Sequence, residues 1–267
     1  MLRTRVITAL LLVAGFALIL FVFPPMAATL AFAAIAALAA WEWGGLMRQE
    51  QPARVMYALL LLLFCWQLTV AAAQLVPVLL AVSAAFWILV VPLWFRFKWT
   101  LAGNDFFGYL LGGLVILPTW AAMVALNAVS TWLLLAAMAL VWVADIAAYF
   151  TGRAFGKHKL APAISPGKTW EGVAGAVAGV MIYGAIVLNY SSLAGQVPLA
   201  TPLLALLLLL LTAVSVMGDL FESLLKRQAG IKDSSNLLPG HGGVLDRIDA
   251  LTSTLPVAAL ILYLLRP

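Results

Sequence analysis

The chain has 267 residues, of which 65% are hydrophobic and only 9% are charged. A soluble domain carries about 25% charged residues, so this composition excludes an ordinary soluble fold. Several apolar runs reach the roughly 20 residues that a helix needs to cross the hydrocarbon core. Runs such as 203–211 are continuous rather than alternating, which excludes a transmembrane β-barrel. We therefore expect an all-α fold, a polytopic transmembrane helix bundle. The net charge of +5 does not indicate nucleic acid, because in such a chain the position of each charge matters more than the sum.

The apolar runs predict about nine spans, which in chain order cover 6–23, 26–46, 55–73, 77–95, 107–126, 131–150, 170–190, 202–224 and 250–266. The first run follows Arg3 and Arg5, as in a signal peptide, but Pro24 and Pro25 follow it in place of a small-residue cleavage site. Because more spans come after it, we interpret it as a retained helix. The single cysteine, Cys65, excludes an intramolecular disulfide.

Nine alternating spans divide the connections between two sides of a membrane. The first side holds the N-terminus and the loops near 47–54, 96–106, 151–169 and 225–249, and the second holds the turns near 24–25, 74–76, 127–130 and 191–201 and the C-terminus. Of the 15 Lys and Arg residues, 14 lie on the first side and only Arg266 lies on the second. Since an excess of Lys and Arg marks the cytoplasmic face, we predict a cytoplasmic N-terminus and a periplasmic C-terminus. All ten Asp and Glu residues also lie on or near the first side, which topology does not require.

Acidic residues near the cytoplasmic ends of the spans are the first sign of chemistry. Asp145 and Asp219 lie inside apolar spans, where an ionisable group is costly and indicates function. Asp246 and Asp249 share one face if the ninth helix begins near them. Mg²⁺ prefers such oxygen ligands, together with substrate phosphates and water. We predict a metal site of Asp219, Asp246 and Asp249. The alternative is that each acid pairs with a nearby base, such as Asp219 with Lys226.

Basic and hydroxyl side chains on the same side are candidate phosphate ligands. Ser223 and Lys226 share one helix face with Asp219, at i+4 and i+7. Arg227 and Lys168 lie where a phosphate would arrive, and Arg binds phosphate as a rigid fork whereas Lys binds it as a point charge. The alternative is that these bases only mark the cytoplasmic side.

Two glycine-containing turns, 165–169 and 240–243, can bring backbone amides close to an anion. The Gly-Lys-Thr triplet at 167–169 is similar to the end of a Walker A motif. That motif needs glycine where Pro162 stands and a strand where a membrane helix precedes the loop, so no P-loop is expected. We expect His241 in the second turn to contact phosphate or to form hydrogen bonds, with a catalytic acid or base as the alternative.

The second half of the chain resembles the bacterial phosphatidate cytidylyltransferases, also called CDP-diacylglycerol synthases. Their motif has Ser, then Lys-Arg, then Lys-Asp, then Pro-x-His-Gly-Gly, then Asp-Arg-x-Asp. The chain carries these residues in the same order, at Ser223, Lys226-Arg227, Lys232-Asp233, Pro239-Gly240-His241-Gly242-Gly243 and Asp246-Arg247-Ile248-Asp249. The stretches 145–149 and 165–172 resemble the family too, so the match covers roughly 145–254.

The resemblance implies that CTP and phosphatidate react to give CDP-diacylglycerol and pyrophosphate. It implies a multi-pass enzyme in the lipid bilayer of the bacterial inner membrane, with its active site facing the cytoplasm. The family depends on Mg²⁺, has been linked with a second cation such as K⁺, and is dimeric, so we expect a homodimer. We expect catalysis from Asp219, Lys226, Asp246 and Asp249, and substrate binding from Ser165, Lys168, Ser223, Arg227, His241, Gly242, Gly243, Arg247, Asp145 and Tyr149.

We expect one integral membrane domain over 1–267, with N-terminal helices in 1–140 and the catalytic helices and loops in 141–267. The main alternative function is a cation- or proton-coupled transporter that uses the intramembrane acids as ion sites. The second side offers no charge except Arg266, so a polar path across the membrane is poorly supported. A CDP-alcohol phosphotransferase is a further alternative, but its Asp-Gly-x-x-Ala-Arg opening is absent from the sequence.

Overall fold

The computed structural model describes residues 2–101, 105–191, 193, 197 and 199–265. The elements are α1 (Leu2–Phe21), α2 (Pro25–Leu46), α3 (Gln51–Val70), η1 (Ala73–Leu75), α4 (Val76–Ala85), η2 (Phe86–Val90), α5 (Val91–Phe97), α6 (Asp105–Val129), α7 (Thr131–Phe155), β1 (Lys159–Ala161), β2 (Ser165–Thr169), α8 (Trp170–Tyr190), α9 (Thr201–Ala229) and α10 (Leu245–Leu265). The segments η1, α4, η2 and α5 run on as one span, Ala73–Phe97, in which η2 is a π-helical turn. In the described part of the chain, nine helices are therefore long and apolar enough to cross a membrane. Arg266, the one base predicted on the second side, lies outside these residues.

The observed helices confirm the predicted spans, and no predicted boundary is wrong by more than five residues. The largest differences lie at the polar ends, where α7 continues to Phe155, α9 continues to Ala229 and α10 begins at Leu245. Hydropathy marks where a helix leaves hydrocarbon, whereas the backbone hydrogen bonds of a helix can continue into water. These polar extensions carry several of the predicted site residues.

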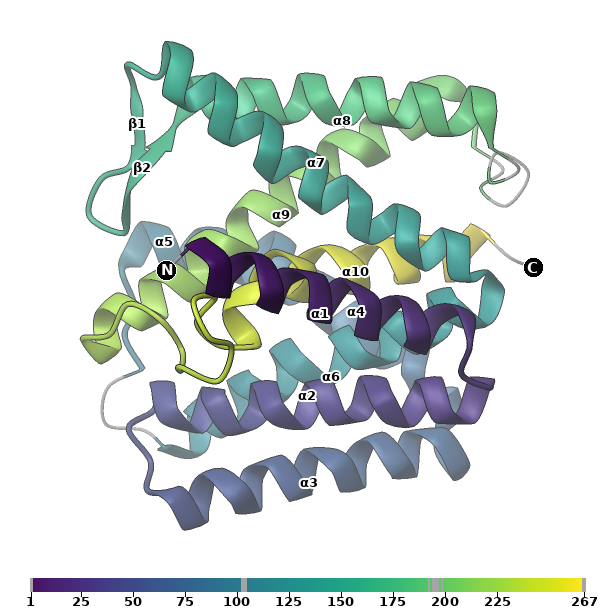
Figure 1. The fold of residues 1–267 in the computed structure, drawn as a ribbon, viewed down its shortest axis with the longest axis vertical. Helices are drawn as coiled ribbons and strands as arrows, with labels where there is room; N and C mark the ends of the chain where they lie inside the picture. The colour runs from purple at the N-terminus through teal and green to yellow at the C-terminus, as the bar shows by residue number, and fades with distance from the viewer. Residues whose placement is uncertain (1, 102–104, 192, 194–196, 198, 266–267) are drawn as a thin grey trace.

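The polar connections gather at one end of the molecule. Figure 1 shows the start of α1, the β1–β2 hairpin and the loop before α10 at this end, whereas the end of α10 lies at the opposite end. We call this the polar end. The grouping agrees with the division of loops into two sides that the alternation of spans predicts.

One element departs from the predicted all-α fold. Residues after α7 form a two-stranded antiparallel sheet in which Lys159 pairs with Thr169 and Ala161 pairs with Ser165. The Thr169 hydroxyl then accepts a hydrogen bond from the Gly172 amide over 3.1 Å and so caps the start of α8. The hairpin thus places Lys168 on a strand directly before a capped helix.

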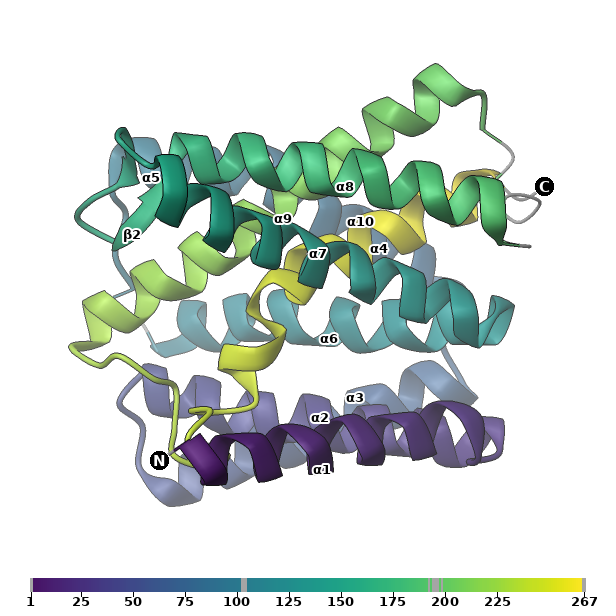
Figure 2. The same ribbon diagram turned by 45° about the horizontal axis from the view of Figure 1, so that its top comes forward.

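The helix α10 forms the centre of the bundle, packed against α9, α6, α4 and α7. Figure 2 shows it between α9 and α6, with α1 at the outer edge of the bundle. Close packing depends on glycine at several crossings. A Cβ atom added at Gly112 would lie 2.5 Å from Trp43 Nε1, and one added at Gly179 would lie 2.8 Å from the Ala147 Cβ. Glycine at these two positions therefore allows the helices to pack closely.

Candidate active site

A cavity of about 400 Å³ opens at the polar end, between the last turns of α7, the first turns of α8, the middle of α9 and the β1–β2 hairpin. Five of the predicted site residues line it: Asp145, Tyr149, Ser165, Lys168 and Asp219. Its walls are otherwise largely apolar, with small residues such as Ala144 and Gly152. An apolar pocket with a few convergent polar groups is typical of a site for a small ligand.

Lys168 and Asp219 form an ion pair across this cavity, and we call them the outer pair. The Lys168 Nζ lies 2.5 Å from the Asp219 Oδ2, and the two side chains are 25% and 28% exposed. Ser223, one turn further along α9, donates a hydrogen bond to the Asp219 Oδ1 over 3.3 Å. The outer pair therefore joins the hairpin to α9 while both charges stay within reach of solvent and ligands.

Behind the outer pair lies a second set of charges, Glu222, Lys226, Asp246 and Asp249, which we call the inner cluster. The Lys226 Nζ donates to the Asp246 Oδ1 over 2.6 Å and lies 3.4 Å from the Glu222 Oε1. The side chains of Lys226, Glu222 and Asp246 are only 11%, 6% and 4% exposed. Asp219 pairs with Lys168 and not with Lys226, which is the partner that the sequence offered as one alternative.

Protein donors surround both oxygens of the Asp246 carboxylate. Its Oδ2 accepts hydrogen bonds from the Ser234 amide over 2.8 Å, the Ser234 hydroxyl over 2.9 Å and the Gly243 amide over 2.8 Å. Lys226 occupies the other oxygen. With both oxygens satisfied, Asp246 holds the 230–244 loop against α9.

Glu42 of α2 anchors the same loop from the other side. Its carboxylate is completely buried. The Oε1 accepts from the Ser235 hydroxyl over 2.6 Å and the Val244 amide over 2.9 Å, and the Oε2 accepts from the Leu245 amide over 2.6 Å. The Oε2 also lies 3.1 Å from the Ser234 hydroxyl, which it shares with Asp246. The sequence offered one signal for Glu42, an acid within an apolar span, which is the signal that singled out Asp145.

The glycines of the second turn let these carboxylates approach. A Cβ atom at Gly242, whose φ is +78°, would lie 2.6 Å from the Asp246 Oδ2. One at Gly243 would lie 2.1 Å from the Ser234 Oγ and 2.4 Å from the Glu42 Oε1. As its composition indicates, this turn brings backbone amides close to anions. In this structure the anions are the carboxylates of Asp246 and Glu42.

Three other predicted substrate ligands lie away from the cavity lining. Arg227 is exposed, and its Nε donates to the Ile164 carbonyl of the hairpin turn over 3.4 Å. Arg247 is exposed at the start of α10. His241 is partly buried, and its Nδ1 has no hydrogen-bond partner among the described residues. Their predicted roles as substrate ligands stay predictions.

The carboxylates fit an oxygen-binding cation at the boundary between the outer pair and the inner cluster. Glu222 interacts with Asp249, and Asp249 interacts in turn with Asp219. Both carboxylate oxygens of Glu222 are buried, and its Oε1 lies 3.4 Å from the Lys226 ammonium. Among the described residues, no group of three or more Asp, Glu, His or Cys side chains is arranged to hold a metal ion. Mg²⁺ usually binds one or two carboxylates and completes its shell with water and phosphate, which this donor set permits.

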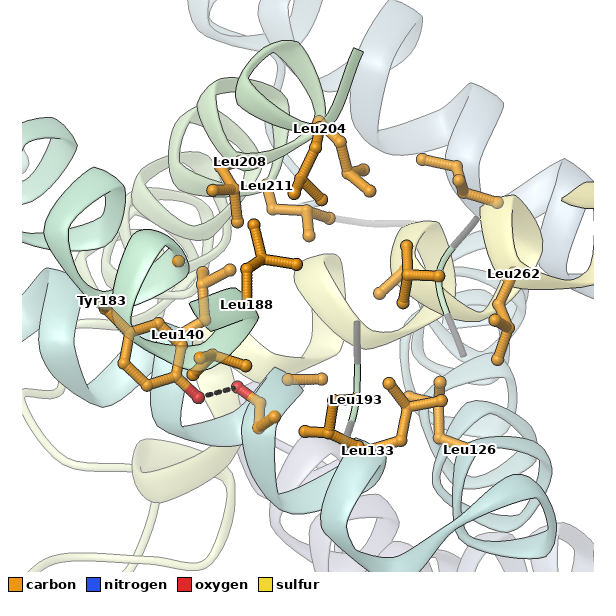
Figure 3. A pocket seen from close by; sticks show the side chains of 18 of the residues that line it. Leu126, Leu133, Leu140, Tyr183, Leu188, Leu193, Leu204, Leu208, Leu211 and Leu262 are labelled. Carbon is orange, nitrogen blue, oxygen red and sulfur yellow. Dashed lines mark hydrogen bonds between the residues drawn. The ribbon is translucent and has the colours of Figure 1, made fainter. Parts of the chain in front are cut away.

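A second cavity, of about 120 Å³, lies at the opposite end of the helices. Figure 3 shows its wall of leucine side chains, with Tyr183 donating its hydroxyl to the Ala136 carbonyl over 2.9 Å. None of its lining residues in the described part of the chain is charged. It has no group with which to bind a nucleotide. The cavity at the polar end gathers five of the predicted site residues and is therefore the candidate active site.

Comparison with known proteins gives the family. The model of the cytidylyltransferase family matches residues 3–265. The chain is 44% identical to a phosphatidate cytidylyltransferase of Pseudomonas aeruginosa, over 98% of this chain and 97% of the relative. It is 36% identical to one of Haemophilus influenzae, over 96% of both chains. One of Bacillus subtilis is 42% identical over 48% of this chain and 46% of the relative.

These matches confirm the resemblance found in the 145–254 motif and extend it to the N-terminal helices, which the motif does not cover. The transporter alternative is therefore not retained. The chain belongs to the cytidylyltransferase family.

Proposed function

We propose that the cavity at the polar end is where this nucleotidyltransferase brings CTP and phosphatidate together. The reaction gives CDP-diacylglycerol and pyrophosphate, a step of phospholipid biosynthesis. The observation that carries the placement is the outer pair, Lys168 and Asp219, in a cavity walled by three apolar helices. Phosphatidate keeps its phosphate at headgroup depth, and CTP arrives from water. A partly exposed charge pair at a helix end is where the two can meet.

The chemistry needs no protein nucleophile. An oxygen of the phosphatidate phosphate attacks the α-phosphorus of CTP in line, a new P–O bond forms, and the bond to the β-phosphate breaks to release pyrophosphate. Catalysis then consists of positioning and of neutralising charge. Lys168 can turn from Asp219 to an arriving phosphate, because both side chains are partly exposed. Ser165 and Tyr149 line the same wall and are in place to orient the substrates.

Mg²⁺ would bind at Asp219 and Asp249, and when bound it would neutralise charge on the phosphates and the leaving pyrophosphate. This set differs from the predicted one in one member. Asp246 is surrounded by donors from Lys226, Ser234 and Gly243, and Glu222 lies 3.4 Å from the Lys226 ammonium. We propose that Asp246 and Glu222 support catalysis by holding Lys226. A role for K⁺ and a homodimer remain predictions.

The orientation follows from charge. Basic residues concentrate on the loops of the polar end, and such an excess marks the cytoplasmic face of a bacterial inner membrane. We propose that the N-terminus and the candidate active site face the cytoplasm, where CTP is available, and that the C-terminus is periplasmic.

A direct assay tests the function and the site together. Purified protein is mixed with labelled CTP, phosphatidate and Mg²⁺ in detergent micelles, and CDP-lipid is measured. We expect product from the wild type, a fall of roughly 100-fold for Asp219→Asn, and normal turnover for Asp105→Asn, which changes an exposed acid away from the cavity. Absence of a CDP-lipid from folded wild-type protein would reject the function. Normal turnover by Asp219→Asn would reject the site.

A further inference from the structure

We infer that Glu42 is a positioning residue for the reaction, and that supplying it is a function of the N-terminal helices. The inference rests on the proposed function, since its effect on turnover presumes that the inner cluster supports cytidylyl transfer. Glu42 lies in α2, whereas the residues it holds are 192 to 203 positions later in the chain. The first helices also contact this region through the Thr8 hydroxyl, which donates to the Pro239 carbonyl over 3.0 Å, but Glu42 supplies their buried charge.

Four donor groups around one carboxylate show what Glu42 does. Two are the hydroxyls of Ser234 and Ser235 in the loop, and two are the amides of Val244 and Leu245 at the start of α10. The one proton of the Ser234 hydroxyl is shared between Glu42 and Asp246. The first amides of a helix have no partners within the helix, so a carboxylate at this point both satisfies them and favours the helix dipole. Glu42 thereby fixes the entry to α10.

The Ser234 hydroxyl joins Glu42 to the inner cluster. Its oxygen lies 3.1 Å from the Glu42 Oε2 and 2.9 Å from the Asp246 Oδ2, and Asp246 holds Lys226. A shift of the loop away from Glu42 would move the donors of Asp246 and release Lys226 from its position. Glu42 touches neither the cavity nor the outer pair, so it acts on the reaction through other residues.

The first experiment measures the loop without substrates. Amide hydrogen exchange of the peptide covering 234–245 is compared in the wild type, Glu42→Gln and Glu50→Gln. The glutamine at 42 keeps the shape of the side chain but turns an amide donor toward groups that are themselves donors. We expect exchange at least about tenfold faster in Glu42→Gln and unchanged in Glu50→Gln, an exposed acid at the start of α3 with no capping bond from its side chain. Unchanged exchange in Glu42→Gln would overturn the anchoring.

The second experiment measures kcat for CDP-lipid formation in a double-mutant cycle. We expect Glu42→Gln and Ser234→Ala each to lower kcat by roughly 10- to 100-fold, and the double variant to be little worse than either, because both act through one connection. Additive losses, or a normal kcat with faster exchange, would overturn positioning while leaving the function intact. If the wild type makes no product, the function fails, and the exchange result still decides the anchoring. Ser235→Ala, which removes one donor of the four, is the milder variant should Glu42→Gln fail to fold, with the same directions expected.

Discussion

The outer pair and the inner cluster both contain Lys paired with Asp, but the two pairs differ in how deeply they are buried. The side chains of the outer pair are 25% and 28% exposed, whereas Lys226 and Asp246 are 11% and 4% exposed. A charge pair near solvent adds little to stability and can exchange its partner for a ligand. A buried pair that is fully hydrogen-bonded is costly to break. The difference in burial suits the outer pair to the substrate binding proposed above, and it suits Lys226 and Asp246 to support of the site.

The largest effect is expected from Lys226→Met. Removing the lysine leaves Asp246, Glu222 and Asp249 buried together without a cation, so the free energy of unfolding should fall by about 3–5 kcal/mol. Thermal unfolding in detergent measures this, and activity should be lost with the fold. Lys157→Met, at an exposed position, is the control and should unfold as the wild type does. An unfolding midpoint equal to that of the wild type would contradict the structural role of the inner cluster.

Gly243→Ala tests how tightly the loop fits around its carboxylates. The added methyl group would meet the Ser234 hydroxyl and the Glu42 carboxylate at less than contact distance, and overpacking of this kind costs about 1–3 kcal/mol. We expect a lower unfolding midpoint and lower turnover together. Gly15→Ala in α1 is the control, because nothing lies within 4 Å of its added Cβ. If both variants have the same unfolding midpoint and turnover, the close fit at Gly243 contributes nothing measurable to stability.

Lys168→Met is expected to separate activity from stability. The outer pair is partly exposed, so its loss should change the free energy of unfolding by less than about 1 kcal/mol. Loss of a charged phosphate contact should lower kcat/KM for CTP by roughly 10- to 100-fold. Lys159→Met, on the neighbouring strand and outside the cavity lining, serves as the control. A strongly lowered unfolding midpoint would instead place Lys168 with the inner cluster.

The smallest effect is expected from Arg227→Lys. The guanidinium is exposed and makes a long hydrogen bond of 3.4 Å to the Ile164 carbonyl, which an ammonium group can replace. If Arg227 only holds the hairpin turn, the substitution should change KM for CTP by about threefold or less. If KM rises tenfold or more, Arg227 binds phosphate as a fork, as the sequence motif predicts, and moves toward CTP when it binds.

Much of the fold could be predicted from the sequence, because the length of an apolar run and the side on which charges lie are local properties. The helical spacing also placed Lys226 on the same face as Asp219. The spacing does not reveal which helices touch. Lys168 comes to Asp219 only through a β-hairpin, and Glu42 meets the loop only through the packing of α2 near α10.

The same limit explains why the proposed metal ligands differ from the predicted ones. Asp246 and Asp219 look alike in sequence, and only the donors around them show that Asp246 is held by Lys226, Ser234 and Gly243. Glu222 lies within the predicted span and beside Ser223 of the motif, but the lysine that it contacts is shared with Asp246 of another helix. Such pairings are decided by tertiary structure rather than by periodicity.

The distance in sequence between Glu42 and its partners has a consequence for biosynthesis. Ser234 follows Glu42 by 192 residues, so at about 5–20 residues per second the ribosome delivers it about 10–40 s later. During this interval a carboxylate of an inserted helix has none of its final donors. Glu42 lies one turn before the end of α2 at Leu46, close enough to the membrane surface to stay hydrated until its donors have been synthesised. Its place near the end of the helix thus suits a chain that inserts from its N-terminus and completes its site last.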